Sequence, residues 1–242
     1  MWHDGVTMTI NNNFQKNANT SLVAQVIWKS PGISRVAIAK ELNLFRSAVT
    51  TIISTLIEWG VVHEAEEGES RAKGGRKPII MRMNNNFGCI AGIEIQPSRY
   101  HAVLLDISGN LCWSSTGKIP DQGTFEDMIS FLMDIITREI IALEVPLLAV
   151  CMGFPGIVDS PNGIVKYVEP FKLKNFDIFS HFKQHYRVPV YVENDANCAA
   201  WLEMSRNRSE PLGDFISIIG EYHEGNYHFG DSSGIGIGTA IS

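Results

Sequence analysis

A basic segment between two short apolar stretches is the feature that most narrows the fold of this chain. Residues 71–78 read Arg-Ala-Lys-Gly-Gly-Arg-Lys-Pro, and they separate Val61–Glu64 from Ile79–Met83. Two strand-like runs around a glycine-containing polar loop are typical of a β-hairpin. A hairpin with a cationic tip suits the edge of a polyanion. The residues before it therefore decide whether it belongs to a nucleic-acid-binding module.

A first helix is predicted over residues 19–29. Leu22, Val23, Val26 and Ile27 recur there at helical spacing, and Ser30-Pro31-Gly32 ends the pattern. Residues 1–17 show no such periodicity, and we expect them to be a disordered lead-in.

Two further helices are predicted before the hairpin. Ser34 is typical of an N-cap, and it begins a second helix over about 34–42. A third helix is expected over about 46–59, with Gly60 as its C-cap. The apolar face of this third helix consists of Val49, Ile52, Ile53, Leu56 and Ile57.

The order of these elements predicts a winged helix-turn-helix domain over residues 18–83. In such a domain the third helix enters the major groove, where Arg46 can reach a guanine edge, and the loop contacts phosphates. The alternative is a small helical bundle with a solvated basic loop. The candidate DNA-binding residues are Arg35, Arg46, Ser47, Thr50, Thr51, Lys73, Arg76 and Lys77.

Charge is distributed unevenly along the chain. The net charge is −6, but residues 1–83 hold ten basic and seven acidic residues, a balance of +3, and the remainder carries −9. This pattern predicts contact with nucleic acid at one end only.

The cysteines and the apolar runs indicate the compartment. The four cysteines form no Cys-x-x-Cys pair, which is typical of reduced thiols in a cytoplasmic protein. We expect no membrane segment, because no apolar run reaches about 18 residues, and no secretory signal is evident. His181 and His185 stand four apart with no third ligand in view, so a solvated helix face is expected rather than a metal site.

The second domain is predicted over residues 87–242. Three strand-like runs joined by short turns indicate an antiparallel meander, and a long amphipathic helix and two further strands follow. The alternation predicts an α/β layer with polar residues at the carboxyl ends of its strands. The strands are expected at 89–95, 100–106, 111–115, 147–152 and 188–192, and the helices at 125–143 and from about residue 196.

Three segments together carry a family resemblance. The basic loop followed by Pro78, the Gly-Phe-Pro-Gly turn at 153–156 and the Glu-Asn-Asp-Ala-Asn-Cys-Ala-Ala stretch at 193–200 resemble the ROK family of repressors, open reading frames and kinases. The resemblance implies an actin-like (ribonuclease H-like) sugar-kinase domain after the winged helix. It also implies a sugar-responsive repressor of carbohydrate genes. The implied partners are double-stranded operator DNA, a sugar or sugar-phosphate effector and further copies of the chain in a homodimer or higher homo-oligomer.

The same resemblance assigns the second site. Asp195 falls where the kinases of the family keep the base that accepts a proton from the sugar hydroxyl. The alternative for Asp195 is an N-cap for the helix that follows. The sugar-binding residues that the resemblance implies are Gly153, Pro155, Gly156, Asn175, Asn194 and Asp195.

One departure from the kinases argues against catalysis. Where they carry a glycine-rich turn for the ATP phosphates, this chain has Glu94-Ile95-Gln96-Pro97-Ser98. Proline lacks an N–H and glutamine adds bulk, so we expect a non-catalytic sensor domain. The runner-up hypothesis is an ATP-dependent, glucokinase-like sugar kinase of the same family.

A second departure concerns the end of the chain. Residues 234–238, Gly-Ile-Gly-Ile-Gly, resemble a second phosphate turn of the family, whose sugar and zinc motifs should follow further downstream. We therefore expect an incomplete, C-terminally truncated domain that uses no zinc and no other cofactor. A remnant that binds DNA without sensing any sugar is a third hypothesis.

Overall fold

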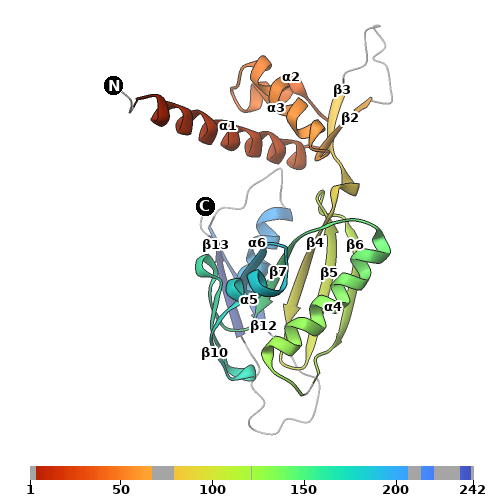
Figure 1. Cartoon of the computed structure of the whole chain (residues 1–242), viewed down its shortest axis with the longest axis vertical. Helices are drawn as coiled ribbons and strands as arrows, with labels where there is room; N and C mark the ends of the chain where they lie inside the picture. Colours follow the sequence, from red (N-terminus) through yellow and green to blue (C-terminus); the bar gives the residue numbers. More distant parts are fainter. Residues whose placement is uncertain (1–3, 67–78, 121, 207–213, 221–234, 241–242) are drawn as a thin grey trace. The chain divides into compact units, whose positions relative to one another are not determined.

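The computed structural model divides into two compact units, Met1–Phe87 and Gly88–Ser242 (Figure 1). It describes residues 4–66, 79–120, 122–206, 214–220 and 235–240. The division falls beside residue 87, the predicted start of the second domain.

The three predicted helices of unit 1 are present. They are α1 (Asp4–Lys29), α2 (Arg35–Glu41) and α3 (Arg46–Glu58). Ser34 caps α2 as expected, because its hydroxyl accepts a hydrogen bond from the Ala37 N–H at 3.3 Å. The core of the unit buries the predicted face of α3. The predicted helix boundaries are thus confirmed at both ends of α2 and α3 to within one residue.

The prediction of a disordered lead-in is wrong for residues 4–17, which belong to α1. No proline or glycine interrupts the chain between Val6 and Lys29, so nothing in the backbone chemistry ends the helix there. The weak apolar periodicity of the asparagine-rich part hid this extension from pattern reasoning.

An antiparallel three-stranded sheet completes unit 1. Its strands β1 (Ile33–Ser34), β2 (Val62–Glu66) and β3 (Ile79–Met83) run in the order β1-β3-β2. Val62 and Met81 are buried in the same core as the helices. Residues 67–78 lie outside the described residues, and with them lie the predicted loop contacts Lys73, Arg76 and Lys77.

Unit 2 is built on a mixed five-stranded sheet in the order β11-β7-β4-β5-β6. Strands β11, β7 and β4 are parallel, whereas β4, β5 and β6 form the predicted antiparallel meander. The strands span Cys89–Ile95 (β4), Arg99–Asp106 (β5), Leu111–Lys118 (β6), Leu147–Phe154 (β7) and Val190–Asn194 (β11).

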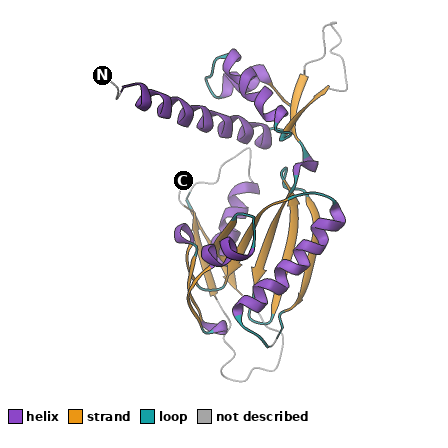
Figure 2. Ribbon diagram, in the orientation of Figure 1, coloured by secondary structure: helices purple, strands orange, loops and turns teal. Residues whose placement is uncertain are grey.

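Helix α4 (Phe125–Leu143) has the predicted bounds and packs along the sheet (Figure 2). A capping box fixes its start, because the Thr124 hydroxyl and the Asp127 carboxylate bond reciprocally to backbone N–H groups. Leu132 and Ile136 are fully buried against the strands.

The segment between β7 and β11 forms a second, smaller sheet that the sequence did not predict. It has the antiparallel order β10-β9-β8, with β8 at Ile157–Asp159, β9 at Ile164–Val168 and β10 at Leu173–Asp177. Single 3-10 turns lie at Asn85–Phe87, Ser160–Asn162 and Glu169–Phe171. The remaining elements are α5 (Ile178–His185), α6 (Asp195–Arg206), β12 (Phe215–Gly220) and β13 (Ile235–Ala240).

Candidate functional site

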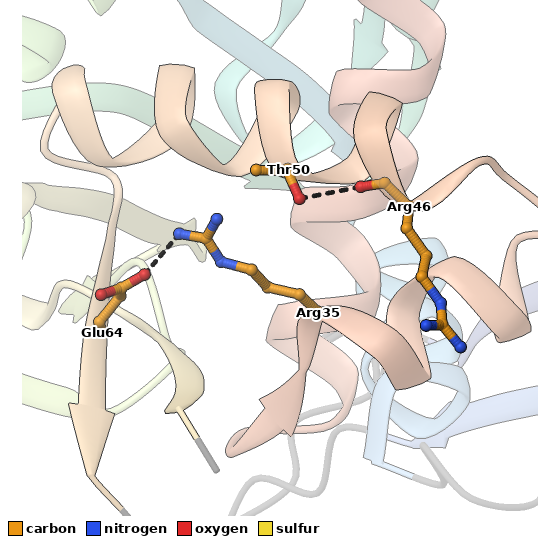
Figure 3. A network of polar contacts seen from close by, with 4 residues as sticks. All are labelled: Arg35, Arg46, Thr50 and Glu64. Carbon is orange, nitrogen blue, oxygen red and sulfur yellow. Dashed lines mark hydrogen bonds and ion pairs between the residues drawn. The ribbon is translucent and has the colours of Figure 1, made fainter. Parts of the chain in front are cut away.

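The first half of α3 presents a polar face to solvent. Arg46, Ser47, Thr50 and Thr51 are all exposed, while Val49 and its apolar neighbours on the opposite side are buried. The Arg46 side chain extends away from the axis of its own helix (Figure 3). Four of the predicted DNA-binding residues therefore share one accessible surface.

The two threonines of this face use their hydroxyl protons within the helix. Thr50 Oγ1 donates to the Arg46 carbonyl at 2.9 Å (Figure 3), and Thr51 Oγ1 donates to the Ser47 carbonyl at 3.1 Å. Each hydroxyl oxygen still has lone pairs to accept a hydrogen bond. The threonines thus offer acceptor oxygens and methyl groups rather than free donors.

Arg35 makes a contact that the sequence did not predict. It is the first residue of α2, and its guanidinium forms an ion pair with the Glu64 carboxylate on β2 (Figure 3). Both side chains are only partly exposed, at 29% and 40%. Arg35 therefore joins the helices to the base of the hairpin, and Glu64 is a residue that pattern reasoning missed.

In unit 2, acidic side chains line the carboxyl ends of the parallel strands. Glu94 on β4 and Glu193 on β11 both pair with Gly153 on β7. Residues directly opposite in neighbouring strands point to the same face of a sheet. The two carboxylates therefore flank the glycine on one face.

Asn194 links two segments that the resemblance assigned to sugar binding. Its side-chain Nδ2 donates to the Gly156 carbonyl at 2.9 Å. Its Oδ1 accepts from the N–H groups of Ala196 at 3.0 Å and Asn197 at 3.2 Å, so Asn194 is the N-cap of α6. The alternative of Asp195 as N-cap is wrong, because Asp195 is the first residue of the helix and its Oδ1 accepts from Ala196 N at 2.8 Å.

The Glu193 carboxylate holds the same region together. Its Oε1 accepts from the Asn194 N–H at 2.8 Å and from Asn197 Nδ2 at 3.0 Å, and its Oε2 accepts from Ser160 Oγ at 2.8 Å. The sequence shows Glu193 as the first residue of a motif without indicating its role. Its acidic side chain beside the polar residues of that motif is the signal that could have identified it.

Close packing explains the glycines around this site. A Cβ built on Gly156 lies 2.2 Å from the Tyr167 carbonyl oxygen of β9, and one on Gly238 lies 2.1 Å from the Ala196 carbonyl oxygen. Residues 235–238, the described part of the segment that resembles a second phosphate turn, form the first residues of strand β13. This strand pairs with β12. Gly238 lacks a side chain, so the first turn of α6 can pack directly against the strand.

Asn175 lies in the neighbouring sheet. Its backbone is left-handed, with φ of 51°, and its side chain is exposed on β10. The preceding residue, Lys174, pairs with Tyr167, whose carbonyl packs on Gly156. Asparagine tolerates this conformation better than most residues do. The structure therefore places Pro155, Gly156, Asn194 and Asp195 in adjoining segments, with Asn175 across β9.

The pKa of the Cys198 thiol reports the negative electrostatic potential of the site. Cys198 on α6 lies opposite Gly153, with its Sγ 3.5 Å from a Cβ built there. Cys198 keeps an exposed edge, but partial desolvation by its surroundings and the nearby negative charges of Glu193 and Asp195 together raise the pKa of this thiol to about 11. A neutral group that donates hydrogen bonds is therefore favoured here over an anion.

The turn at residues 95–99, where the resemblance leads one to expect a phosphate turn, is occupied by side chains of its own residues. Gln96 Nε2 donates to Glu94 Oε1 at 3.0 Å, and Arg99 Nε donates to Gln96 Oε1 at 2.7 Å. The Gln96 N–H donates to the Arg99 carbonyl at 2.9 Å. Because Pro97 contributes no N–H, this turn offers few donors to a phosphate.

His181 differs from its prediction as a solvated residue. It is half-buried among aromatic rings, and the centroid of its ring is 5.8 Å from that of Phe176 and 4.7 Å from that of His185. Burial lowers the pKa of His181, which favours the neutral imidazole.

The residues that the structure describes contain neither a metal-binding cluster nor a membrane-spanning helix. No group of three or more His, Cys, Asp or Glu side chains there is placed to hold a metal ion. No helix in that part of the chain is both long and apolar enough to cross a membrane.

Comparison with known proteins gives consistent matches. Residues 90–220, more than half of the chain, match the model of the ROK family. The xylose repressor of Caldicellulosiruptor bescii is 28% identical over 234 residues, which are 96% of this chain and 55% of that protein. The transcriptional dual regulator NagC of Escherichia coli is 26% identical, over 87% of this chain and 51% of its own length.

A solved structure shows the same fold over both units. It is described as a ROK family transcriptional regulator, homologous to the E. coli MLC protein, and it has a TM-score of 0.71 and 21% identity. The match covers 93% of this chain and 55% of that one. The chain thus spans about half the length of the relatives it matches.

Proposed function

Because this chain belongs to the ROK family, we propose that it is a sugar-responsive transcriptional repressor. Unit 1 is a winged helix-turn-helix that binds operator DNA, and unit 2 is a non-catalytic sensor for a sugar. The protein acts in the cytoplasm as a homo-oligomer, because paired half-sites give such modules their affinity and specificity.

The observation that carries the DNA-binding proposal is the exposed face at the start of α3. Arg46 is free to enter the major groove, where guanine presents two acceptors to a guanidinium. Thr50 and Thr51 accept hydrogen bonds there, and their methyl groups suit thymine. The contacts of Lys73, Arg76 and Lys77 with phosphates belong to the same proposal.

The sensor proposal rests on the Asn194–Gly156 link and the acidic row beside it. Carboxylates and backbone carbonyls accept hydrogen bonds from sugar hydroxyls, whereas the negative charge of the carboxylates repels a phosphate. We therefore propose a neutral sugar rather than a sugar phosphate. Its binding shifts the affinity for DNA by a coupling free energy of about 1–3 kcal/mol.

A kinase is the second candidate, because Asp195 lies beside the Gly153–Gly156 turn, where the resemblance places a catalytic base. The side-chain network of Gln96 opposes it by occupying the turn that phosphates need. A coupled ADP assay with a panel of neutral sugars distinguishes the two. Turnover that Asp195→Asn abolishes would establish the kinase.

The proposed function is tested by selection of duplexes from a random-sequence library with the full chain. We expect a two-half-site consensus, and we expect at least one neutral sugar to raise the melting temperature and to release the selected duplex. A chain that enriches no sequence contradicts the DNA-binding part. A chain that binds DNA but responds to no sugar contradicts the sensor part.

A further inference from the structure

Phe45 is an anomaly at the start of α3. It is the N-cap residue of the helix, yet its side chain makes no capping hydrogen bond. The N-cap position favours Ser, Thr, Asp and Asn, which satisfy an unpaired N–H of the first turn. Phe45 is also 85% exposed, so its ring is not part of the core. An aromatic ring at this position benefits neither the local helix nor the packing of unit 1.

On the basis of the proposed function, we propose that Phe45 is a specificity residue whose ring contacts the 5-methyl group of a thymine in the major groove. The N-terminal end of the third helix is the end that enters the groove. The thymine methyl is the apolar group that base edges present there, and phenylalanine is among the side chains that contact it.

The surroundings of the ring favour DNA as the occupant of this surface. Arg46 follows Phe45 directly and is exposed, and the sequence up to residue 83 carries a net charge of +3. Thr50 and Thr51 direct their hydroxyl protons into the helix, which leaves their methyl groups for apolar contact. Exposed apolar groups beside a cation match a groove in which methyl groups alternate with polar edges and phosphates.

A thymine-to-deoxyuridine scan of the duplex selected by the full chain tests this contact. Deoxyuridine lacks only the methyl group and keeps the base pair and its hydrogen-bonding edge. Loss of one buried methyl should weaken binding about fourfold at one position of each half-site. The remaining positions should tolerate the change.

The variant Phe45→Ser connects that position to the ring. Serine supplies the missing cap, so the melting temperature should stay equal or rise while the effect of deoxyuridine disappears. Trp59→Ser is the matched control, because Trp59 is 59% exposed at the other end of α3. This control should keep the full effect of deoxyuridine.

The outcomes separate the inference from the proposed function. A selected duplex that shows no methyl-dependent position, or a Phe45→Ser variant that keeps the dependence, overturns the inference alone. Phe45→Ser that loses self-association without a methyl effect overturns it in favour of a contact between copies of the chain. Failure of the parent to select any duplex removes the proposed function and this inference together.

Discussion

The start of α3 and the carboxyl ends of β4, β7 and β11 differ in how their polar groups are used. At the start of α3, Arg46 extends into solvent (Figure 3), and the N-cap residue Phe45 is exposed. In unit 2, the Asn194 side chain is already bonded to the Gly156 carbonyl. The Glu193 carboxylate is already bonded to the Asn194 N–H and to the Asn197 side chain. The first surface suits a large partner that supplies its own geometry. The second is ordered before any ligand arrives, which lowers the entropy lost on binding.

The largest expected effect tests the close packing of the ordered site. Gly156→Ala places a methyl group 2.2 Å from the Tyr167 carbonyl oxygen, so the backbone must shift. We expect the free energy of unfolding to fall by about 3 kcal/mol. Chemical denaturation measures this, with Gly153→Ala as control, since its nearest contact is an ordinary 3.5 Å. Equal stability of both variants would show that the loop relaxes freely.

Asn194→Ala removes two interactions of one side chain. The helix cap and the bond to Gly156 together should be worth about 2 kcal/mol. Hydrogen exchange should accelerate most at the Asn197 amide, because the Ala196 amide keeps its bond to Asp195 Oδ1. Asn194→Asp keeps the cap but not the donor, so it should retain slow exchange at the Asn197 amide while the loop loosens. Identical exchange in both variants would argue against separate roles for the two ends of the side chain.

Arg46→Ala tests the open surface. Loss of a bidentate contact with guanine should weaken binding to the selected duplex about tenfold and should relax the choice of base at one position. Lys29→Ala removes an equal charge from the end of α1 and should leave base choice unchanged. Electrophoretic titration with specific and random duplexes measures both. If the Arg46→Ala protein distinguished specific from random duplexes as well as the parent does, base recognition would have to lie outside α3.

The pKa of Cys198 predicts a pH dependence for the ordered site. A rise from 9.0 to about 11 leaves the folded protein with about one hundredth of the thiolate of the unfolded chain at neutral pH. The higher intrinsic nucleophilicity of a more basic thiolate offsets part of this, so alkylation should be about tenfold slower. The rate should climb until the pH passes about 11. Iodoacetamide labelling with and without denaturant, resolved by peptide mass, checks this. Equal alkylation rates in the folded and denatured states would show that the surroundings of Cys198 do not raise the pKa of its thiol.

The smallest effect concerns the ion pair between Arg35 and Glu64. Exposed pairs of this kind typically contribute about 0.2–1 kcal/mol, and salt screens them. A double-mutant cycle on the free energy of unfolding should give a coupling in that range at low salt and a smaller one at 1 M salt. If Arg35→Ala reduced the affinity for DNA while Glu64→Ala increased it, Glu64 would be shown to compete with DNA for the Arg35 guanidinium.

Elements with strong local patterns were predictable. The bounds of α4 and β4 are the predicted ones, because an amphipathic repeat or an apolar run was flanked by turn residues. Strand β1 was not predictable, since two residues become a strand only by pairing with β3. The β8–β10 sheet was missed for a similar reason. Its strands are short and contain charged residues, and their pairing depends on neighbours distant in the sequence.

In the candidate sites, too, contacts between residues distant in the sequence were not predictable. The glycine-containing turn after β7 and the polar end of β11 were visible as motifs, and α/β topology brings such ends together. The bond between Asn194 and Gly156 joins residues 38 apart, and the Arg35–Glu64 pair joins residues 29 apart. No local pattern encodes either. Phe45 was overlooked because a phenylalanine before a helix reads as core until its exposure is known.

One carboxamide, that of Asn194, ties a loop to the origin of a helix dipole. Any occupant that displaces the Gly156 carbonyl must turn this side chain and so disturb the first amides of α6. Ligand binding would thereby change the hydrogen bonding at the start of α6, which is observable by spectroscopy. Nitrogen-15 labelling of asparagine side chains would make that single NH₂ group a direct reporter of occupancy.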